Sequence, residues 1–317
     1  MGLCSDRRGF IKSALLAPVA ASVLSSGAST AEPDPETTLP RGMIGNMAVS
    51  RLLLGGNLLT HYTHSRDLQY VYNLCAHYNT QDKILETLQL AERHGINTLV
   101  VHTAGNILET LKKHRYDRGG KMQWIICPTA EIKDDMAEYA RMVRDLAADG
   151  TDAIYLWGVR ADKLAAEGRM DLIAKAVDLV REEGVPSGVG AHDLNVIVEC
   201  EKAKINADFY IKTFHHHNYP SAPKPEQITG ATSESPAYWC RDPQATMDVM
   251  KDVEKPWIAF KVLAAGAIHP KVAFRYAFEN GADIICVGMY DFQVVENVNL
   301  ALAALDGPLV RSREWRA

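Results

Sequence analysis

Side chains that can move protons or bind a metal ion gather where apolar runs of this sequence end. They are imidazoles, carboxylates and amines, namely His102, Glu131, His192, Lys212, His215, His217 and Lys261. Neutral imidazole and carboxylate are the usual protein ligands of Zn²⁺, Mn²⁺, Fe²⁺ and Co²⁺. A strand directs alternate residues to one face, so His215 and His217 can point the same way. We expect His102, His215 and His217 to bind one divalent metal ion, the alternative being hydrogen-bonded residues of a pocket wall.

Two lysines interrupt apolar runs. Lys212 and Lys261 lie where a charged amine is costly unless it meets a carboxylate, a ligand or water. Such an amine can bind a substrate oxygen, act as a base with a lowered pKa, or form an imine, the alternative being a salt bridge to Glu131 or Asp291. We expect Lys212, Lys261, His192 and Glu131 to be catalytic, although Glu131 can instead open a helix.

Aromatic residues are frequent in two long segments, 61–81 and 218–242. They can form the wall of a pocket for a polar ring, or they can simply pack the two loops. From these segments and from the strand ends we expect substrate contacts at Trp157, Tyr238, Trp239 and Asp291. His64 in the first segment is a further candidate if that loop folds over the site.

The elements that must position these groups alternate regularly along the chain. Eight short apolar runs predict strands at 51–56, 98–103, 122–127, 152–157, 186–190, 208–214, 257–261 and 283–288. Segments with helical apolar spacing follow at 83–94, 132–148, 170–183, 194–204, 243–251, 270–280 and 292–305. Eight successive strand–helix units predict an α/β fold, a single (β/α)₈ TIM barrel, with its chemistry at the carboxyl ends of the strands.

Several short motifs make the chain resemble an aldo-keto reductase barrel. They are Val49-Ser50-Arg51-Leu52 before Gly55, Gly95-Ile96-Asn97, Asp152 to Leu156, Val189-Gly190, Leu263 to Gly266 and Glu296-Asn297. The catalytic pattern of that family does not carry over. His102 stands where the family has an Asp, no Tyr follows it, Cys127-Pro128-Thr129 lacks the lysine, and Trp157 replaces a histidine.

The cofactor pattern of the family is also altered. Its Ser-Asn pair, which holds the nicotinamide amide, falls on His192 and Asp193, and its sixth-strand Gln falls near Lys212. Its cationic cluster for the adenosine phosphate is replaced by Tyr290-Asp291-Phe292. Asp193 is also well placed to cap a helix. Without the four catalytic residues and the dinucleotide clamp, the sequence argues against NAD(P) and in favour of a divalent metal ion.

An export signal is expected at the amino terminus. Arg7 and Arg8 precede a short apolar stretch and a small-residue cleavage pattern at 29–31, which is typical of a twin-arginine signal. We expect a signal peptide at 1–31, an extended lead-in at 32–45 and the barrel domain at 46–317. The mature protein is then periplasmic or otherwise exported in a bacterium, has the twin-arginine export machinery as a partner, and has no stable membrane span.

Composition narrows the other partners. The chain has 34 Lys and Arg against 39 Asp and Glu, and no basic stripe that indicates nucleic acid. Five cysteines follow the signal without C-x-x-C spacing, so no disulfide framework is expected beyond one optional bridge between Cys75 and Cys240. Cys127 and Cys286 are expected to be buried.

Together these features favour an exported barrel enzyme. We expect metal-assisted acid/base chemistry of the lyase, isomerase or hydrolase type on a small polyhydroxylated, sugar-like molecule. One alternative is an NAD(P)-dependent oxidoreductase of the aldo-keto reductase type with an altered site. Another is a non-catalytic periplasmic barrel that only binds its ligand.

Overall fold

The computed structural model describes residues 38–317, which belong to a compact unit spanning Pro35–Ala317. The expected signal peptide at 1–31 and the first part of the expected lead-in lie outside the described residues.

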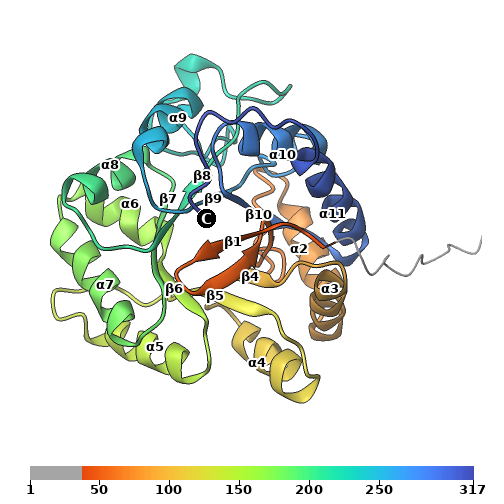
Figure 1. Ribbon diagram of the computed structural model, residues 1–317, viewed down its shortest axis with the longest axis horizontal. Helices are drawn as coiled ribbons and strands as arrows, with labels where there is room; N and C mark the ends of the chain where they lie inside the picture. The colour runs from red at the N-terminus through yellow and green to blue at the C-terminus, as the bar shows by residue number, and fades with distance from the viewer. Residues whose placement is uncertain (1–37) are drawn as a thin grey trace, which may run out of the picture. The chain divides into compact units, whose positions relative to one another are not determined.

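Eight parallel strands close into a barrel, as the sequence predicts. They are β3 (Leu52–Gly55), β4 (Thr98–His102), β5 (Gln123–Cys127), β6 (Ala153–Leu156), β7 (Ser187–Ala191), β8 (Phe209–Thr213), β9 (Trp257–Phe260) and β10 (Ile284–Gly288). Each pairs with its sequence neighbour, and β10 pairs with β3 to close the sheet. Helices surround this barrel in Figure 1. The (β/α)₈ fold is confirmed.

Ten α-helices accompany the strands in the described part of the chain. They are α2 (Gln69–Tyr78), α3 (Gln81–Arg93), α4 (Ile107–Lys112), α5 (Ala137–Ala148), α6 (Gly158–Ala166), α7 (Met170–Glu182), α8 (Leu194–Lys202), α9 (Pro243–Asp252), α10 (Pro270–Glu279) and α11 (Asp291–Leu305). The seven predicted helices are present, whereas α2, α4 and α6 were not predicted. A π-helix at Lys113–Asp117 and a 3₁₀ turn at Pro225–Gln227 complete the helical segments.

Local signals explain several helix ends. The side chains of Asp193 and Asp242 accept hydrogen bonds from the backbone N–H groups of Asn195 and Ala245, which starts α8 and α9. The expected cap at Asp193 is thus confirmed. Gly281 follows α10 with a φ of 102°, a left-handed conformation that favours glycine and ends the helix before β10.

A hairpin that the sequence analysis did not predict closes the amino-terminal end of the barrel. Strands β1 (Arg41–Ile44) and β2 (Met47–Ser50) pair antiparallel, and β1 begins inside the expected lead-in. Ile44, Met47 and Val49 join the apolar cluster that fills the barrel interior. The hairpin is drawn across the barrel in Figure 1, beside the carboxyl terminus. The barrel interior is therefore a packed core at this end.

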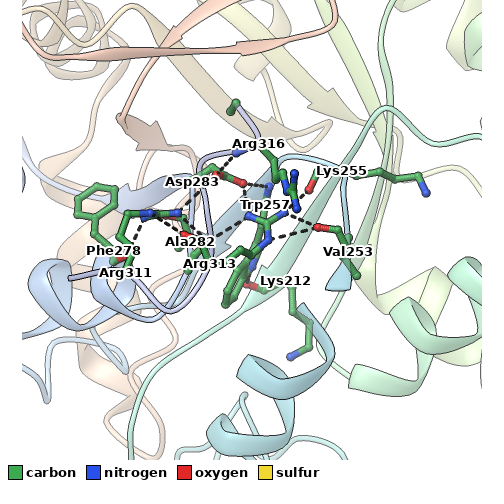
Figure 2. Close-up of polar contacts among 12 residues, drawn as sticks. Lys212, Val253, Lys255, Trp257, Phe278, Ala282, Asp283, Arg311, Arg313 and Arg316 are labelled. Carbon is green, nitrogen blue, oxygen red and sulfur yellow. Dashed lines mark hydrogen bonds and ion pairs between the residues drawn. The ribbon is translucent and has the colours of Figure 1, made fainter. Parts of the chain in front are cut away.

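The carboxyl-terminal tail forms a buried polar network at the same end, around Asp283 (Figure 2). Asp283 is 0% exposed, and its Oδ2 accepts hydrogen bonds from Arg313 Nη1 at 2.6 Å and from the Trp257 backbone at 2.9 Å. Its Oδ1 accepts one from the Arg316 backbone at 2.8 Å. Arg313 also donates to the carbonyl of Val253 at 2.7 Å. The buried charge is thus paired on all sides, which the desolvation of a carboxylate demands.

Cation–aromatic contacts hold the rest of the tail. The Trp315 ring lies between two guanidinium groups, with Arg51 Cζ at 4.0 Å and Arg311 Cζ at 3.4 Å from its centroid. Arg51 also donates to the carbonyl oxygens of Asp283 and Ala317. The tail therefore joins β3 to β10 at the base of the barrel.

The cysteines settle two smaller expectations. Cys75 and Cys240 are both free and buried, so the optional bridge between them is not formed. Cys127 and Cys286 are buried in the barrel interior, as expected. Within residues 38–317, no helix has the length and apolar character needed to cross a membrane.

Candidate active site at the barrel mouth

A collar of aromatic and basic side chains surrounds the carboxyl-terminal mouth of the barrel. It consists of Tyr62, His64, His102, Trp157, His192, Trp239, Phe260 and Lys261, and we call it the mouth collar. Strands β4, β6, β7 and β9 supply His102, Trp157, His192, Phe260 and Lys261 at their ends. The long loops after β3 and β8 supply the other three side chains. From the sequence, the candidate residues were expected at the carboxyl ends of the strands. Four of them, His102, Trp157, His192 and Lys261, lie in the mouth collar at strand ends.

Neighbouring members of the mouth collar are in ring-to-ring contact. His102 stacks parallel to Trp157 at 6.2 Å between centroids, and Tyr62 meets His102 edge-on at 6.4 Å. His64 lies 4.8 Å from Tyr62 and 5.5 Å from Trp239. Trp157 also packs on the apolar core of the barrel, so the collar sits directly above that core.

The other half of the collar carries the amine. Lys261 Nζ lies 4.9 Å from the centroid of the Trp239 ring and 5.9 Å from that of Phe260. Phe260 in turn lies 5.4 Å from the His192 ring. Gly158 separates His192 from Trp157, because a Cβ there would lie only 3.1 Å from His192 Cε1. The collar is therefore linked by ring contacts from Trp157 round to His192, with Gly158 between these two ends.

His192 is held by a carboxylate that the sequence analysis did not identify. Asp162 of α6 lies 2.7 Å from His192 Nδ1 through its Oδ2, and its Oδ1 accepts from the backbone N–H groups of His192 and Asp193, both at 3.0 Å. Burial lowers the pKa of His192, although the hydrogen bond that its ring donates to Asp162 opposes this shift. The imidazole is therefore neutral near pH 7, with its proton on Nδ1 facing Asp162 and Nε2 available as an acceptor.

Lys261 is the amine in the collar, and its backbone conformation is unusual. Its φ is 57°, a left-handed value that costs a non-glycine residue about 1–3 kcal/mol. Its ammonium group makes no hydrogen bond or ion pair with any residue in 38–317. Burial lowers its pKa to about 7, while the negative charges of Glu234 and Asp162 act in the opposite direction. The protonated and the neutral amine are therefore both accessible near neutral pH.

Glu234 connects the two long loops above the collar. Its Oε1 accepts a hydrogen bond from the Tyr72 hydroxyl at 3.0 Å and lies 3.5 Å from His64 Nδ1, which makes no hydrogen bond. The other ring nitrogen of His64 is 3.0 Å from Asn57 Nδ2. Burial lowers the pKa of His64 to about 2, and the nearby charge of Lys261 adds to that effect. His64 is thus a neutral contact between the two loops, and it brings the first loop to the mouth.

The expected metal ligands do not converge. His102 ends β4, whereas His215 and His217 follow β8, which lies opposite β4 in the closed barrel. His217 Nε2 is 2.7 Å from the carbonyl oxygen of Cys240. No group of three or more His, Cys, Asp or Glu within residues 38–317 has the arrangement of a metal site. The prediction of a metal bound by His102, His215 and His217 is therefore wrong.

His215 is a buried histidine without polar partners. It is 1% exposed, and neither of its ring nitrogens has a hydrogen-bond partner among the described residues. Its ring centroid lies 5.9 Å from that of His217 and 6.1 Å from that of Trp239. Burial lowers its pKa to about 3, and His217 adds to this shift. It supports Trp239 from behind as a neutral ring.

Two residues expected to be catalytic lie away from the collar. Phe209 and Ile211 face the barrel interior, so the alternation along β8 turns Lys212 to the outer side of that strand. Its amine donates to Thr213 O and Oγ1 at 3.0 and 2.9 Å, and in Figure 2 it points away from the Asp283 network. The side chain of Glu131 is 61% exposed and lies 4.0 Å from Arg160. Neither side chain belongs to the mouth collar, although Thr213 Oγ1 links the Lys212 amine to the carbonyl oxygens of His192 and Trp239.

Two of the four expected substrate contacts are occupied by structural interactions. Asp291 accepts a hydrogen bond from the Tyr78 hydroxyl at 2.7 Å and pairs with Lys83 at 3.0 Å, outside the collar. Tyr238 is buried and accepts a hydrogen bond from the Gly230 backbone within its own loop. Trp157 and Trp239 are members of the collar, where a bound molecule would meet them.

Sequence reasoning missed Asp162, Glu234 and Phe260. Asp162 lies five residues after Trp157 in a helix that was not predicted, and Glu234 lies in a long loop without periodicity. Phe260 had a usable signal, because it lies near the end of the predicted strand 257–261 and stands directly before Lys261. A systematic inspection of each strand end would have found it.

Comparisons with solved structures support the fold. The chain is similar to a candidate aldo-keto reductase from Pseudomonas aeruginosa, at 18% identity and a TM-score of 0.58, covering 86% of this chain and 98% of the other. It is also similar to an aldo-keto reductase from Bacillus halodurans in its holo form, at 13% identity and a TM-score of 0.57, covering 85% and 92%. No protein-family model matches the chain, and no curated protein matches it in sequence.

A third structure bears on the cofactor. A point variant of the protein Gox0644, in complex with NADPH, shares 12% identity and a TM-score of 0.55, covering 85% of this chain and 93% of the other. The expectation of a metal-assisted lyase, isomerase or hydrolase is contradicted, because these neighbours are aldo-keto reductases and no metal cluster is present within residues 38–317. The argument against NAD(P) is contradicted as well, because a neighbour of this fold is in complex with NADPH.

Proposed function

We propose that this protein is an NAD(P)-dependent oxidoreductase of the aldo-keto reductase type with an altered site. The observation that carries the proposal is Lys261. An amine with a pKa of about 7 and no carboxylate partner lies at the mouth of a barrel whose structural neighbours are aldo-keto reductases. A proton donor is most effective when its pKa is near the working pH.

The collar residues have separate tasks in carbonyl reduction. A bound reduced nicotinamide would supply the hydride. Lys261 would donate the proton that the carbonyl oxygen needs as it becomes an alcohol, a role that contributes about 10²- to 10⁴-fold in rate. His192, oriented by Asp162, would accept a hydrogen bond from a substrate hydroxyl through Nε2. Trp157 and Phe260 would exclude water from the reacting atoms.

The mouth fits one end of the dinucleotide better than the other. Trp157 and Phe260 offer the flat apolar faces that a nicotinamide ring requires. At the start of α11, the rings of Tyr290 and Phe292 stack on each other at 5.4 Å, and Asp291 already pairs with Lys83. That segment provides no clamp for the phosphate on the adenosine ribose. We therefore expect NADH and NADPH to bind with affinities within about threefold of each other.

Four further elements of the proposal rest on sequence. Other residue types stand at the four positions where the family has its catalytic residues, so Lys261 would take over proton donation. A small polyhydroxylated carbonyl compound is the proposed substrate, since aromatic faces pack well on sugar rings. The twin-arginine pattern at Arg7 and Arg8 supports export to the bacterial periplasm by the corresponding machinery. The mature protein would then be a single barrel domain.

Nucleotide binding and turnover test this function together. Purified wild-type protein and the variant Lys261→Met would be titrated with NADH and NADPH, and nucleotide oxidation would be followed with a panel of aldoses and simple aldehydes. We expect both proteins to bind nucleotide and the variant to lose about 100-fold or more in kcat/KM. Lys271→Met, at an exposed lysine of α10, is the control. The proposal fails if the wild-type protein binds neither nucleotide, or binds them and reduces nothing.

A further inference from the structure

Glu234 is placed to act on the proton donor from the far side of the mouth. Its carboxylate is bonded to Tyr72 and lies against His64, both from the first long loop, while Glu234 itself belongs to the second. His64 packs on Trp239, and Trp239 lies under the ammonium group of Lys261. One chain of contacts thus leads from Glu234 through His64 and Trp239 to Lys261.

We propose that Glu234 is a positioning residue that joins the two long loops over the mouth and holds a negative charge on the side of the mouth where Trp239 and Lys261 lie. The inference rests on the proposed function, because it concerns the same amine. Glu234 does not touch the reacting atoms. It acts through Tyr72 and His64, which hold its loop, and through its charge.

The charges around Lys261 make this role specific. The titratable groups of the mouth around Lys261 are Asp162, His64, His102, His192, His215, Glu234 and the amine of Lys212. The four histidines have pKa values lowered by burial, so they are neutral near pH 7. Asp162 already accepts hydrogen bonds from His192 and from two backbone N–H groups. Glu234 is therefore the negative charge whose position depends on loop closure.

The sign of the effect follows from simple electrostatics. A nearby negative charge favours the protonated amine, so its loss lowers the pKa of Lys261 further. A reductase that needs a protonated donor would then lose activity at a lower pH. Because the Glu234 side chain is 40% exposed, the effect would be strongest at low ionic strength and would weaken as salt screens the charge.

The decisive experiment measures the amine itself, independently of turnover. Full-length wild-type protein, Glu234→Gln and the control Glu226→Gln would be acetylated with limiting acetic anhydride between pH 6 and 10 at low salt. Peptide mass spectrometry would give the fraction of Lys261 modified at each pH. Glu226 is an exposed glutamate of the same loop, without an ion pair among the described residues.

We expect the half-point of Lys261 labelling near pH 7 in the wild-type and control proteins, and at least about half a pH unit lower in Glu234→Gln. A half-point unchanged by Glu234→Gln would overturn the inference and leave the proposed function standing. A half-point near the ordinary lysine value in all three proteins would instead remove the basis of the proposed function.

A second variant separates charge from closure. Tyr72→Phe removes the hydroxyl that holds Glu234 and leaves the carboxylate in place. We expect faster amide hydrogen exchange in segments 61–68 and 230–240 for Tyr72→Phe and for Glu234→Gln, but not for Glu226→Gln. Exchange that is the same in all variants would contradict the role of Glu234 in closing the loops.

Discussion

The two ends of the barrel treat buried charge in opposite ways. At the base, Asp283 and Arg313 lie 2.6 Å apart, and each has additional hydrogen-bond partners in the tail and the strand ends. At the mouth, Lys261 has no polar partner within residues 38–317, and both ring nitrogens of His215 are unpaired. A paired network fixes one structure, whereas unpaired polar groups remain available to a ligand.

The difference shows how this fold separates stability from chemistry. A carboxylate with four polar neighbours holds the carboxyl-terminal tail against the barrel. An amine above an apolar core and between aromatic rings has a pKa of about 7 and can exchange its proton at neutral pH. Buried polar groups have hydrogen-bond partners at the base, whereas some at the mouth have none among the described residues. Such exceptions are expected at a functional site.

The largest expected effect is the loss of stability when the network at the base is disrupted. Asp283→Asn leaves the guanidinium of Arg313 buried without a counter-charge, so we expect the free energy of unfolding to fall by about 3–5 kcal/mol. Urea unfolding followed by circular dichroism measures this loss. Asp306→Asn, at an exposed residue after α11, is the control and should lie within about 0.5 kcal/mol of wild type. A small loss in Asp283→Asn would show that the network does not hold the tail.

The pH dependence of stability tests the unpaired state of His215 near the mouth. The pKa of this buried histidine is about 3 in the folded protein, below its ordinary value of 6.5. The unfolded chain therefore binds a proton below pH 6.5 that the folded protein does not, and stability falls as pH decreases toward 3. His215→Leu should reduce the loss between pH 6.5 and 4.5 by about 2 kcal/mol.

Exposed His77→Gln is the control for that measurement. The comparison would be weakened if the wild-type protein and His215→Leu lost the same free energy between the two pH values, because His215 would then have an unrecognised partner in the folded state.

Orientation of His192 is the next prediction. Asp162→Asn replaces the carboxylate 2.7 Å from Nδ1 by an amide, which no longer fixes the proton on that nitrogen. We expect kcat/KM for carbonyl reduction to fall by about 10- to 100-fold with a smaller change in nucleotide affinity. Asp134→Asn, at a surface ion pair with Arg169, is the matched control. An equal loss in kcat/KM for both variants would argue against a special role for Asp162.

The smallest expected effect sharpens the geometry of the collar. A methyl group at Gly158 would lie 3.1 Å from His192 Cε1, so Gly158→Ala should displace that ring by a few tenths of an ångström. We expect kcat/KM to fall by roughly threefold while stability changes by less than about 1 kcal/mol. Gly230→Ala has open space around it and should change neither quantity.

The sequence predicted most of the barrel because its signals are local. Period-two and period-3.6 apolar patterns and the glycines after helices mark all eight strands and seven of the helices. The base was not predicted, since the hairpin and the tail residues Arg311 to Ala317 have no periodicity. The tail is held by hydrogen bonds to Asp283, about 30 residues earlier in the chain, and by the contact of Trp315 with Arg311. These contacts form only once the barrel has folded.

The site was predicted in part for the same reason. His102, Trp157, His192 and Lys261 were located because carboxyl ends of strands meet at one end of a barrel. Strand alternation places Lys212 on the outer face of β8, where its amine bonds Thr213, and its catalytic role stays a prediction. Asp162 lies in a helix that was not predicted, and Glu234 lies in a long loop. Residue spacing therefore could not predict that either one lies at the collar.

The pH dependence of carbonyl reduction tests the central claim most directly. If Lys261 donates the proton, kcat/KM of the wild-type protein should fall about tenfold per pH unit above pH 7, and Lys261→Met should show a low and flat profile. A wild-type rate that stays constant to pH 9, or a Lys261→Met variant that retains both the rate and the profile, would contradict the account.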